Sequence, residues 1–479
     1  MDMSVTPLTV PAPFGTAYDP RYDPMVQPHP GRAAAYAPTW WVASAGTPPP
    51  DDGPIDGDID VDVAIIGSGA TGLCTALYLA QEHGIRAVVL EANQTAWGCS
   101  SRSGGQGQNA SGRLKRSQWI ERYGLDTAKR LDAEIRAGFD NFKALTQEID
   151  CDAFEGGHLH LAHRPEKIKV LEAEAELAHK TFGYTTRMMS AEQVRRDYCD
   201  EREQAGAMFE AEGVGIHPLK FSFGLMRKAR ALGVRVHTGS PVQGWRSEAG
   251  VQHLRTPGGT VRARRVAVCT GGYTGQRLSP QLKSRTLPIL SNSVVTRVLT
   301  AAEMAACNVR SETFMTDTRT LRFYYRFLRG NRLQIGSRSS VTGADAQAPG
   351  HLKLLTDAIA RKFPALAGIG IEHSWWGWVD VSHDMMPRIA RPDADKPVWY
   401  AVGYGGNGVS FSTWAGKRLA ERIAGRDAGR DVFELPIYNS ALPLPQLRFG
   451  ATIESRLFAP FRRIGQRLLY KWYWAQDEL

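Results

Sequence analysis

The sequence has no run of about 18 consecutive apolar residues, the length that a membrane-spanning helix requires. Its N-terminus also lacks the basic start and apolar stretch that are typical of a secretory signal peptide. We therefore expect a cytoplasmic protein.

Cysteine is scarce, and the six cysteines among the 479 residues are scattered. They form no CxxC pair and no cluster with histidine, which argues against a zinc site or a disulfide framework. Buried thiols that act as small apolar residues explain them better. His158 and His160 alternate on one predicted strand, but no third ligand accompanies them. The sequence therefore predicts no metal site.

Acidic residues are fewer than basic ones, and the formal net charge is +9. Nucleic-acid binding is one explanation, but no zinc finger, helix-turn-helix or RNA-binding aromatic motif accompanies the charge. Attraction for an anionic substrate or a phosphate-rich cofactor explains the charge as well. We predict no nucleic-acid partner.

The chain is long for one hydrophobic core, and about 150 residues per domain suggests two or three domains. Residues 1–58 hold 12 of the 27 prolines and read as an N-terminal extension that Trp40 and Trp41 pin to the body. The predicted class is α/β, with a Rossmann-like dinucleotide-binding domain interrupted by an α+β substrate domain whose sheet is mainly antiparallel. The first domain comprises residues 59–112, 205–285 and 370–435, the second comprises 113–204 and 286–369, and 436–479 form a basic tail.

A glycine motif follows the first predicted strand, residues 59–66. Gly67–Gly72 has the form GxGxxG, and a helix with one apolar face follows it at 71–83. A second buried strand at 87–90 ends in Glu91, which lies 19 positions beyond the motif. A GxGxxG alone is weak evidence, but this strand, turn, helix and acidic strand end together indicate a dinucleotide site.

Each part of the motif has a physical role. Gly67 permits the tight turn, Gly69 lets a diphosphate approach the backbone, and Gly72 lets the helix pack closely on the strand. The helix N-terminus presents free N–H groups and a positive dipole to the phosphates. Glu91 accepts hydrogen bonds from ribose hydroxyls and would repel a 2′-phosphate, which argues against NADP at this site.

The segment after the second strand favours FAD over NAD. Trp97–Gln106 is rich in glycine and hydroxyl residues, which suits a loop that wraps closely around a ligand. A short NAD-binding domain would continue with another helix and strand instead.

In these residues the chain resembles the D-amino acid oxidase-like flavoproteins, a family that includes glycine and sarcosine oxidases. Within that family it most resembles the γ-glutamylputrescine oxidase branch. The likeness covers roughly residues 59–475. It rests on five stretches, which are Asp62–Glu91, Gly98–Gln106, Gly233–Val242, Val268–Gly272 and Gly403–Val409. The sequence differs from the family pattern in Ser103, where asparagine is usual, and in Asn407, where histidine is usual.

The resemblance implies FAD in the interrupted Rossmann-like domain. Some members of the superfamily attach FAD covalently through cysteine or histidine, but we expect non-covalent FAD here. Cys99 is the one cysteine in a loop expected to face the flavin, and no histidine lies there. The implied cofactor-binding residues are Gly67, Gly69, Ala70, Thr71, Gly72, Glu91, Ala92, Ser101, Arg102, Ser103, Gly104, Gly105, Gln106, Val242, Thr270, Gly271, Gly405, Gly406, Asn407, Gly408 and Val409.

The resemblance also implies the reaction, which is oxidation of a carbon–nitrogen bond in a small amine or amino acid. A hydride passes to flavin N5, the imine product hydrolyses, and the electrons pass to O₂ or another acceptor. No obligatory side-chain base is needed, and no catalytic residue is assigned. Tyr324, Tyr325 and Arg326 occupy the position where the family binds the substrate carboxylate, although core packing explains them equally.

Two other functions remain open. Gly403, Gly405 and Gly408 form a second GxGxxG after an apolar strand, which suggests a flavin-dependent NAD(P)H reductase. No further strand with an acidic end follows it, so we interpret this loop as a cap on the flavin, with the helix at 410–423 directed toward the ring. The other alternative is a non-catalytic flavoprotein.

The C-terminal stretch combines arginines with Leu468, Leu469, Trp472 and Trp474. A basic aromatic helix of this kind contacts a membrane surface or docks on protein. We favour docking on the body of the protein or on another subunit, which leaves self-association open.

Overall fold

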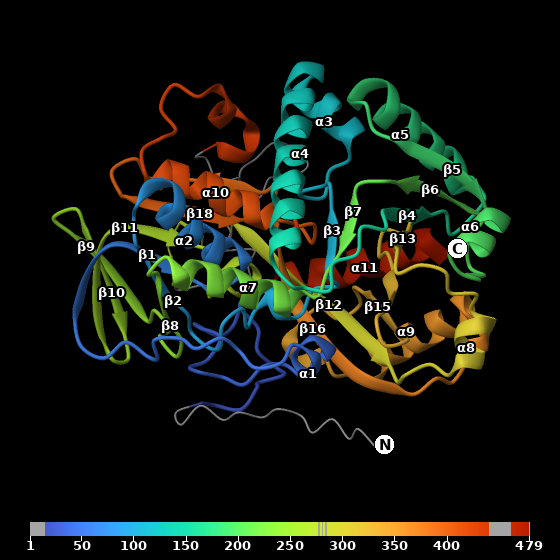
Figure 1. Cartoon of the computed structure of the whole chain (residues 1–479), viewed down its shortest axis with the longest axis horizontal. Coiled ribbons are helices and arrows are strands. Elements are labelled where there is room, and N and C mark those ends of the chain that lie inside the picture. The colour runs from blue at the N-terminus through green and yellow to red at the C-terminus, as the bar shows by residue number, and fades with distance from the viewer. Residues whose placement is uncertain (1–14, 276–277, 280, 283–284, 440–460, 479) are drawn as a thin grey trace.

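The computed structural model describes residues 15–275, 278–279, 281–282, 285–439 and 461–478 (Figure 1). Two large sheets organise these residues, each with its own hydrophobic core. The predicted class is confirmed, since a parallel sheet with helices stands beside a second sheet that is mainly antiparallel.

The first sheet has the central strand order β17-β18-β11-β1-β2-β8. Its strands pair in parallel from β18 to β8, while β17, β10 and β9 add antiparallel edges. The bounds are β1 (Ile59–Ile66), β2 (Val88–Leu90), β8 (Arg235–His237), β9 (Gly244–Glu248), β10 (Val251–Thr256), β11 (Gly259–Val268), β17 (Arg388–Ala390) and β18 (Val398–Val402).

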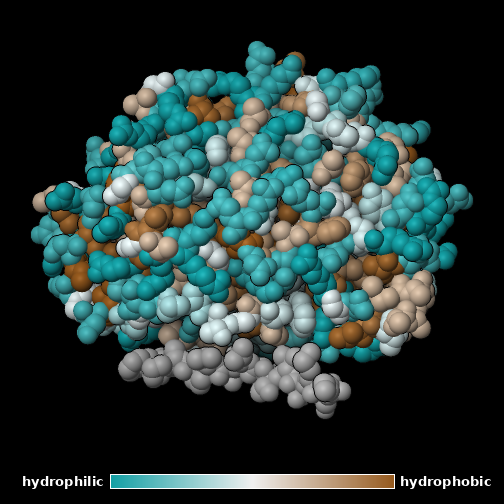
Figure 2. Space-filling view, in the orientation of Figure 1, coloured by the Kyte–Doolittle hydropathy of each residue, from teal (hydrophilic) through white to brown (hydrophobic). Residues whose placement is uncertain are grey.

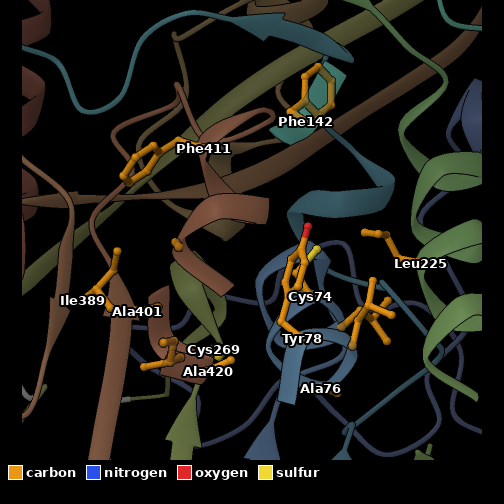
Figure 3. Close-up of a cluster of buried hydrophobic side chains, with 14 of the residues drawn as sticks. Cys74, Ala76, Tyr78, Phe142, Leu225, Cys269, Ile389, Ala401, Phe411 and Ala420 are labelled. Carbon is orange, nitrogen blue, oxygen red and sulfur yellow. The ribbon is translucent and has the colours of Figure 1, made fainter. Parts of the chain in front are cut away.

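Both faces of this sheet are buried, which explains the continuous apolar run at the end of β1. Val63 and Ile65 face a core shared with α2 (Ala70–His83), α7 (Pro218–Ala231) and α10 (Phe411–Ile423). Ala64 and Ile66 alternate with them and face a second apolar cluster. Figure 3 shows part of the first core, where Cys74 and Tyr78 of α2 lie among side chains from the sheet and from α7 and α10.

The second sheet has the order β16-β12-β15-β14-β13-β4-β6-β5, in which only the β13–β4 pair is parallel. Helix α9 (Pro349–Lys362) packs against its core. The strands are β4 (His158–Leu161), β5 (Thr186–Ser190), β6 (Gly206–Glu210), β12 (Thr286–Thr296), β13 (Phe314–Asp317), β14 (Tyr324–Leu328), β15 (Arg332–Ser337) and β16 (Ile371–Ser382).

Two strands begin just after the predicted domain boundaries at residues 205 and 370. Both β6 and β16 belong to the second sheet, although the sequence placed them in the dinucleotide-binding domain. An alternating pattern predicts a strand but does not indicate which of two sheets it joins.

The remaining elements lie around the two sheets (Figure 1). A short two-stranded sheet joins β3 (Gln106–Gln108) to β7 (Gly213–Gly215). The other helices are α1 (Trp40–Ser44), α3 (Arg116–Tyr123), α4 (Leu125–Glu148), α5 (Glu166–Phe182), α6 (Ala191–Asp197), α8 (Ala301–Ala306) and α11 (Arg462–Glu478).

The N-terminal extension is pinned to the body as the sequence predicted. Trp41 is buried, and its indole nitrogen donates to the carbonyl of Ser103 at 2.8 Å. Asn93 holds the same segment further upstream, since its side-chain oxygen accepts from the amide of Ala34 at 2.9 Å. The extension therefore contacts the loop predicted to hold the flavin.

Helix α11 docks on the body through its polar side. The carboxylate of Asp477 accepts from the backbone amides of Thr320 and Leu321 at 2.9 and 3.0 Å, and Arg463 pairs with Asp23 at 3.0 Å. The apolar side chains of Ile464, Leu468 and Trp472 are exposed on the opposite side. The part of the predicted basic tail at 440–460 lies outside the described residues.

No helix in the described ranges has the length and apolar character needed to cross a bilayer. The face seen in Figure 2 is mostly hydrophilic, with small separate apolar areas.

Candidate functional site

One cavity of about 320 Å³ lies where the two sheets meet, and most of the predicted cofactor-binding residues line it. Its walls come from the carboxyl ends of β1, β2 and β11, where an open α/β sheet normally binds ligands. The predicted residues in the walls are Gly67, Gly69, Ala70, Thr71, Glu91, Ala92, Arg102, Ser103, Gly104, Gln106, Val242, Thr270, Gly271, Gly405, Gly406, Asn407, Gly408, Val409 and Tyr324.

The glycine turn has the geometry that its sequence indicated. Gly67 adopts φ +103°, and a Cβ there would lie 2.8 Å from the carbonyl oxygen of Cys269. A Cβ on Gly72 would lie 1.9 Å from the carbonyl oxygen of Gly67, so this glycine allows close packing without lining the cavity. A Cβ on Gly69 would meet only Ser100 Oγ, at 3.2 Å. The missing side chain of Gly69 therefore leaves room in the cavity, whereas Gly67 and Gly72 avoid clashes with the backbone.

Helix α2 begins at this turn with its positive end toward the cavity. Gly69 is its N-cap and supplies no side-chain cap, and the first turn holds no acidic residue. The Ala70 amide donates to Ser100 Oγ at 3.0 Å, and the other amides of the first turn and the helix dipole can act on an anion outside the helix, as a diphosphate site requires.

Glu91 is held in place at the end of β2. Its Oε2 accepts from the amide and the hydroxyl of Ser68 at 2.9 and 2.8 Å, and its Oε1 accepts from the amide of Asn93 at 3.0 Å. Burial raises the pKa of this carboxyl, and the hydrogen bonds oppose that effect. The group lines the cavity where the motif predicts a ribose.

The N-terminal extension contributes residues that the sequence reasoning missed. Pro28, His29 and Pro30 line the cavity, and the carbonyl of Pro30 accepts from the side chain of Asn93, two positions after Glu91, at 3.0 Å. No sequence pattern in this proline-rich stretch predicts that it lines a cavity. Only the tertiary fold brings it to the site.

The flavin loop carries a buried arginine without an acidic partner in the described residues. The guanidinium of Arg102 stacks on Trp97, 4.2 Å from the ring centroid, and also lies over Tyr273. Arg102 Nη2 and Gln106 Nε2 are buried without a hydrogen-bond partner, and both residues line the cavity. Unsatisfied donors of this kind suit a ligand rich in acceptors.

Two predicted cofactor residues lie behind the cavity wall rather than in it. The hydroxyl of Ser101 donates to the carbonyl of Trp97 at 2.9 Å, so it stabilises the turn of the loop. Gly105, at φ +63°, has the carbonyl oxygen of Ile216 2.2 Å from its would-be Cβ. Both residues shape the loop.

The 403–408 loop belongs to the same cavity. Gly405 and Gly406 adopt φ +65° and +95°, and Asn407 Nδ2 donates to the carbonyl of Gly112 at 2.6 Å. Within the described part of the chain, α10 is followed by short 3-10 turns and α11 and by no further strand. The geometry therefore fits a cap on the flavin better than a second nucleotide domain.

These residues fit FAD, and the comparison with known families agrees. Residues 62–422 match the family described as FAD dependent oxidoreductase. The chain belongs to this family. Its cofactor is FAD.

The relatives extend over most of the chain. It is 31% identical over 434 residues to the gamma-glutamylputrescine oxidoreductase of Escherichia coli K12. This match covers 87% of this chain and 97% of the relative. It is 26% identical to the sarcosine oxidase subunit beta of Arthrobacter sp., over 77% of this chain and 88% of the relative. The crystal structure of glycine oxidase from Geobacillus kaustophilus shares the fold, with a TM-score of 0.66 at 21% identity and coverage of 80% and 99%.

We expect the FAD to be released when the flavoprotein is denatured. Cys99 donates its thiol hydrogen to the carbonyl of Trp378, with the sulfur 2.6 Å from the oxygen, and burial raises its pKa to about 12. A thiol in this state is a poor nucleophile toward the flavin. After acid precipitation, all of the yellow colour should appear in the supernatant. Colour that stays with the precipitate would contradict this prediction.

The three predicted substrate residues have different positions. Tyr324 lines the cavity, its ring packs on Gly104, and its hydroxyl bonds to the hydroxyls of Ser291 and Ser293 at 2.9 and 2.8 Å. Tyr325 points to the opposite face of β14 and is fully buried in the second core.

Arg326 shares the face of Tyr324 but lies beneath the wall of the cavity. Its Nη2 donates to the carbonyl of Ile216 at 2.5 Å, and its guanidinium lies over Trp41. The structure places neither Tyr325 nor Arg326 in the cavity wall, and their role in substrate binding stays a prediction. The sequence could not separate them from Tyr324, since one strand supplies all three.

Three other arginines line the cavity, and the sequence reasoning missed them. Arg113 follows β3, Arg322 precedes β14, and Arg338 follows β15. They are 16 and more positions apart in the sequence, so no local motif joins them. Tyr470 and Tyr473 of α11 lie close enough to influence the pKa of Arg113 and Arg338.

The histidine pair at β4 has a third neighbour, Glu210. The ligand atoms of His158, His160 and Glu210 all lie within 4.8 Å of one another. These atoms already have protein partners, since His158 bonds to Thr316, and Glu210 accepts from both His160 and Arg116. A structural polar cluster explains this arrangement, and the absence of a metal stays a prediction.

Proposed function

We propose that this flavoprotein oxidises a carbon–nitrogen bond in a small amine or amino acid that carries an acid group. The observation that carries the proposal is the cationic end of the FAD cavity, where Arg113, Arg322 and Arg338 lie beside Tyr324. Relatives named for gamma-glutamylputrescine and sarcosine support the amine class.

FAD held in this cavity would supply a hydride acceptor for the carbon next to nitrogen, and the product of that oxidation is an imine that hydrolyses in water. The arginines would hold the acid group and so orient that carbon, because a planar guanidinium binds a carboxylate through two hydrogen bonds. The Tyr324 hydroxyl, fixed by Ser291 and Ser293, would close the same wall. The positive end of α10 next to the cavity would favour negative charge on the reduced cofactor.

The test is an anaerobic panel of amines with the purified yellow holoenzyme. We expect at least one amine with an acid group, such as an N-alkyl amino acid, a cyclic imino acid or a γ-glutamyl amine, to bleach the flavin absorbance. Amines of similar size without an acid group should reduce it at least about tenfold more slowly, since they lose a charge-assisted contact. NADH should leave the flavin oxidised.

Rapid bleaching by NADH alone would favour the NAD(P)H reductase, and a flavin that no compound reduces would favour a non-catalytic flavoprotein. Peroxide formed on readmitting air would identify O₂ as the acceptor.

We also propose a cytoplasmic location for this protein. Cell fractionation tests it. Docking of α11 on the body leaves its apolar side open to a second subunit, which sedimentation of the purified protein would detect.

A further inference from the structure

Three guanidinium groups converge on one end of the FAD cavity from separate segments. Arg113 lies between β3 and α3, whereas Arg322 and Arg338 flank the hairpin of β14 and β15. This end is also lined by Thr316, Tyr324 and Ser291 from the second sheet. The glycine turn and Glu91, where the motif predicts the diphosphate and the ribose, are in another part of the wall that the first sheet supplies.

No carboxylate of the described residues forms an ion pair with these arginines, although Asp317 acts on Arg322 and Asp477 on Arg338 from a greater distance. Arg113, Arg322 and Arg338 have no acidic group within 4.0 Å, whereas Arg319 nearby pairs with three carboxylates. The two acidic residues that line the cavity are engaged elsewhere, since Ser68 holds Glu91 and the Gly403 amide donates to Asp380.

Most of the donors on the three groups are unused. Among the described residues, Arg113 donates to the carbonyl of Gly405 at 3.3 Å and Arg338 to that of Thr320 at 2.6 Å. Arg322 Nε is buried without a partner. Each guanidinium carries five N–H donors, so the site can still bind several acceptor oxygens.

The pKa shifts of Arg113 and Arg322 are consistent with three guanidinium groups that lie close together. Burial lowers the pKa of Arg113 most, and the charges of Arg338 and Arg322 lower it further. Burial and the charge of Arg338 also lower the pKa of Arg322, and the charge of Asp317 opposes them only in part. Mutual repulsion in a partly desolvated space destabilises the empty site, and an anion would relieve it.

We propose that these three arginines bind two acid groups, so that the substrate is an amine with two carboxylates, a dicarboxylic amino or imino acid. This assignment rests on the proposed function. A single carboxylate occupies one bidentate arginine, which leaves the other charges unmatched. A polyamine chain that ends in a second ammonium would be repelled by them.

The test measures binding and does not depend on turnover. Malonate, succinate and glutarate are titrated into the oxidised holoenzyme against acetate, propionate and butyrate, with the flavin spectrum and calorimetry as readouts. We expect the best dicarboxylate to bind at least about tenfold tighter than any monocarboxylate, since each hydrogen bond to a charged group adds a factor of ten or more.

The variants R322M and R338M should each weaken dicarboxylate binding about 10- to 100-fold and reduce the preference over the monocarboxylate. R322K should recover part of the loss, because it keeps the charge without the planar fork. The matched control is R329M at the far end of β14, where the side chain is 55% exposed and should leave binding unchanged.

Equal affinity of the wild-type protein for both acid classes would overturn the inference. This comparison needs no variant, so it decides the question even if a variant misfolds or loses FAD. Monocarboxylated amines that reduce the flavin would still uphold the proposed function in that case. Tight dicarboxylate binding with no reduction by any amine would uphold the two-acid site and refute the proposed function.

Discussion

Replacing Gly69 by glutamate should give a folded protein that purifies without yellow colour. The new side chain would extend into the cavity, where the turn and the α2 N-terminus are placed for a diphosphate. Like charges in contact cost several kcal/mol, so we expect FAD affinity to fall at least about 100-fold. Absorbance at the flavin band against protein concentration, with titration of the apoprotein by FAD, measures the effect.

The fold should survive this change, since Gly69 has an ordinary backbone conformation and a Cβ there meets only Ser100 Oγ. Gly69→Ala is the matched control and should weaken FAD binding much less. Gly72→Ala should instead disturb folding, because its Cβ would lie 1.9 Å from the carbonyl oxygen of Gly67. A G69E protein with full colour and unchanged affinity would refute the diphosphate assignment of this turn.

Lys362→Met should lower the free energy of unfolding of the second domain by about 3–5 kcal/mol, as expected for one partner removed from a buried ionic cluster. Lys362 is fully buried at the end of α9, and its Nζ lies 3.0 Å from Glu203, 3.3 Å from Glu201 and 3.4 Å from Asp317. Without the lysine, the one described group that still donates a hydrogen bond to the carboxylate of Glu201 is the hydroxyl of Tyr325, at 3.1 Å. Urea denaturation of the holoenzyme measures the loss.

Lys353→Met is the control from the same helix, because that side chain is 73% exposed and its one ionic partner among the described residues is Asp357. It should change stability by about 0.5 kcal/mol or less. Adding Glu201→Gln to the Lys362 variant should recover part of the stability, since the unpaired carboxylate is removed. If Lys362→Met and Lys353→Met unfold at the same urea concentration, the buried cluster does not stabilise the domain.

Local patterns were enough to identify the cofactor domain. The GxGxxG turn, the apolar face of α2 and the acidic end of β2 are determined by residues within about thirty positions of one another, so their physical requirements are written in consecutive sequence. The predicted strand at 59–66 and helix at 71–83 correspond to β1 and α2, and Gly84 ends the helix in the left-handed conformation, as a C-cap glycine should. The mainly antiparallel character of the second sheet was also predicted.

Only the tertiary structure decided which residues form the far end of the cavity. Tyr324 and Arg326 share a face of one strand, yet the loop around Gly105 covers Arg326 and leaves Tyr324 in the wall. The proline-rich extension and the three arginines reach the site from distant segments, and burial, pairing and strand partners depend on contacts that sequence spacing does not encode. The sequence by itself predicted the turn and the strand ends that we assign to FAD, because they are built from local backbone geometry. The substrate end required the fold, because separate parts of the chain bring its charges together.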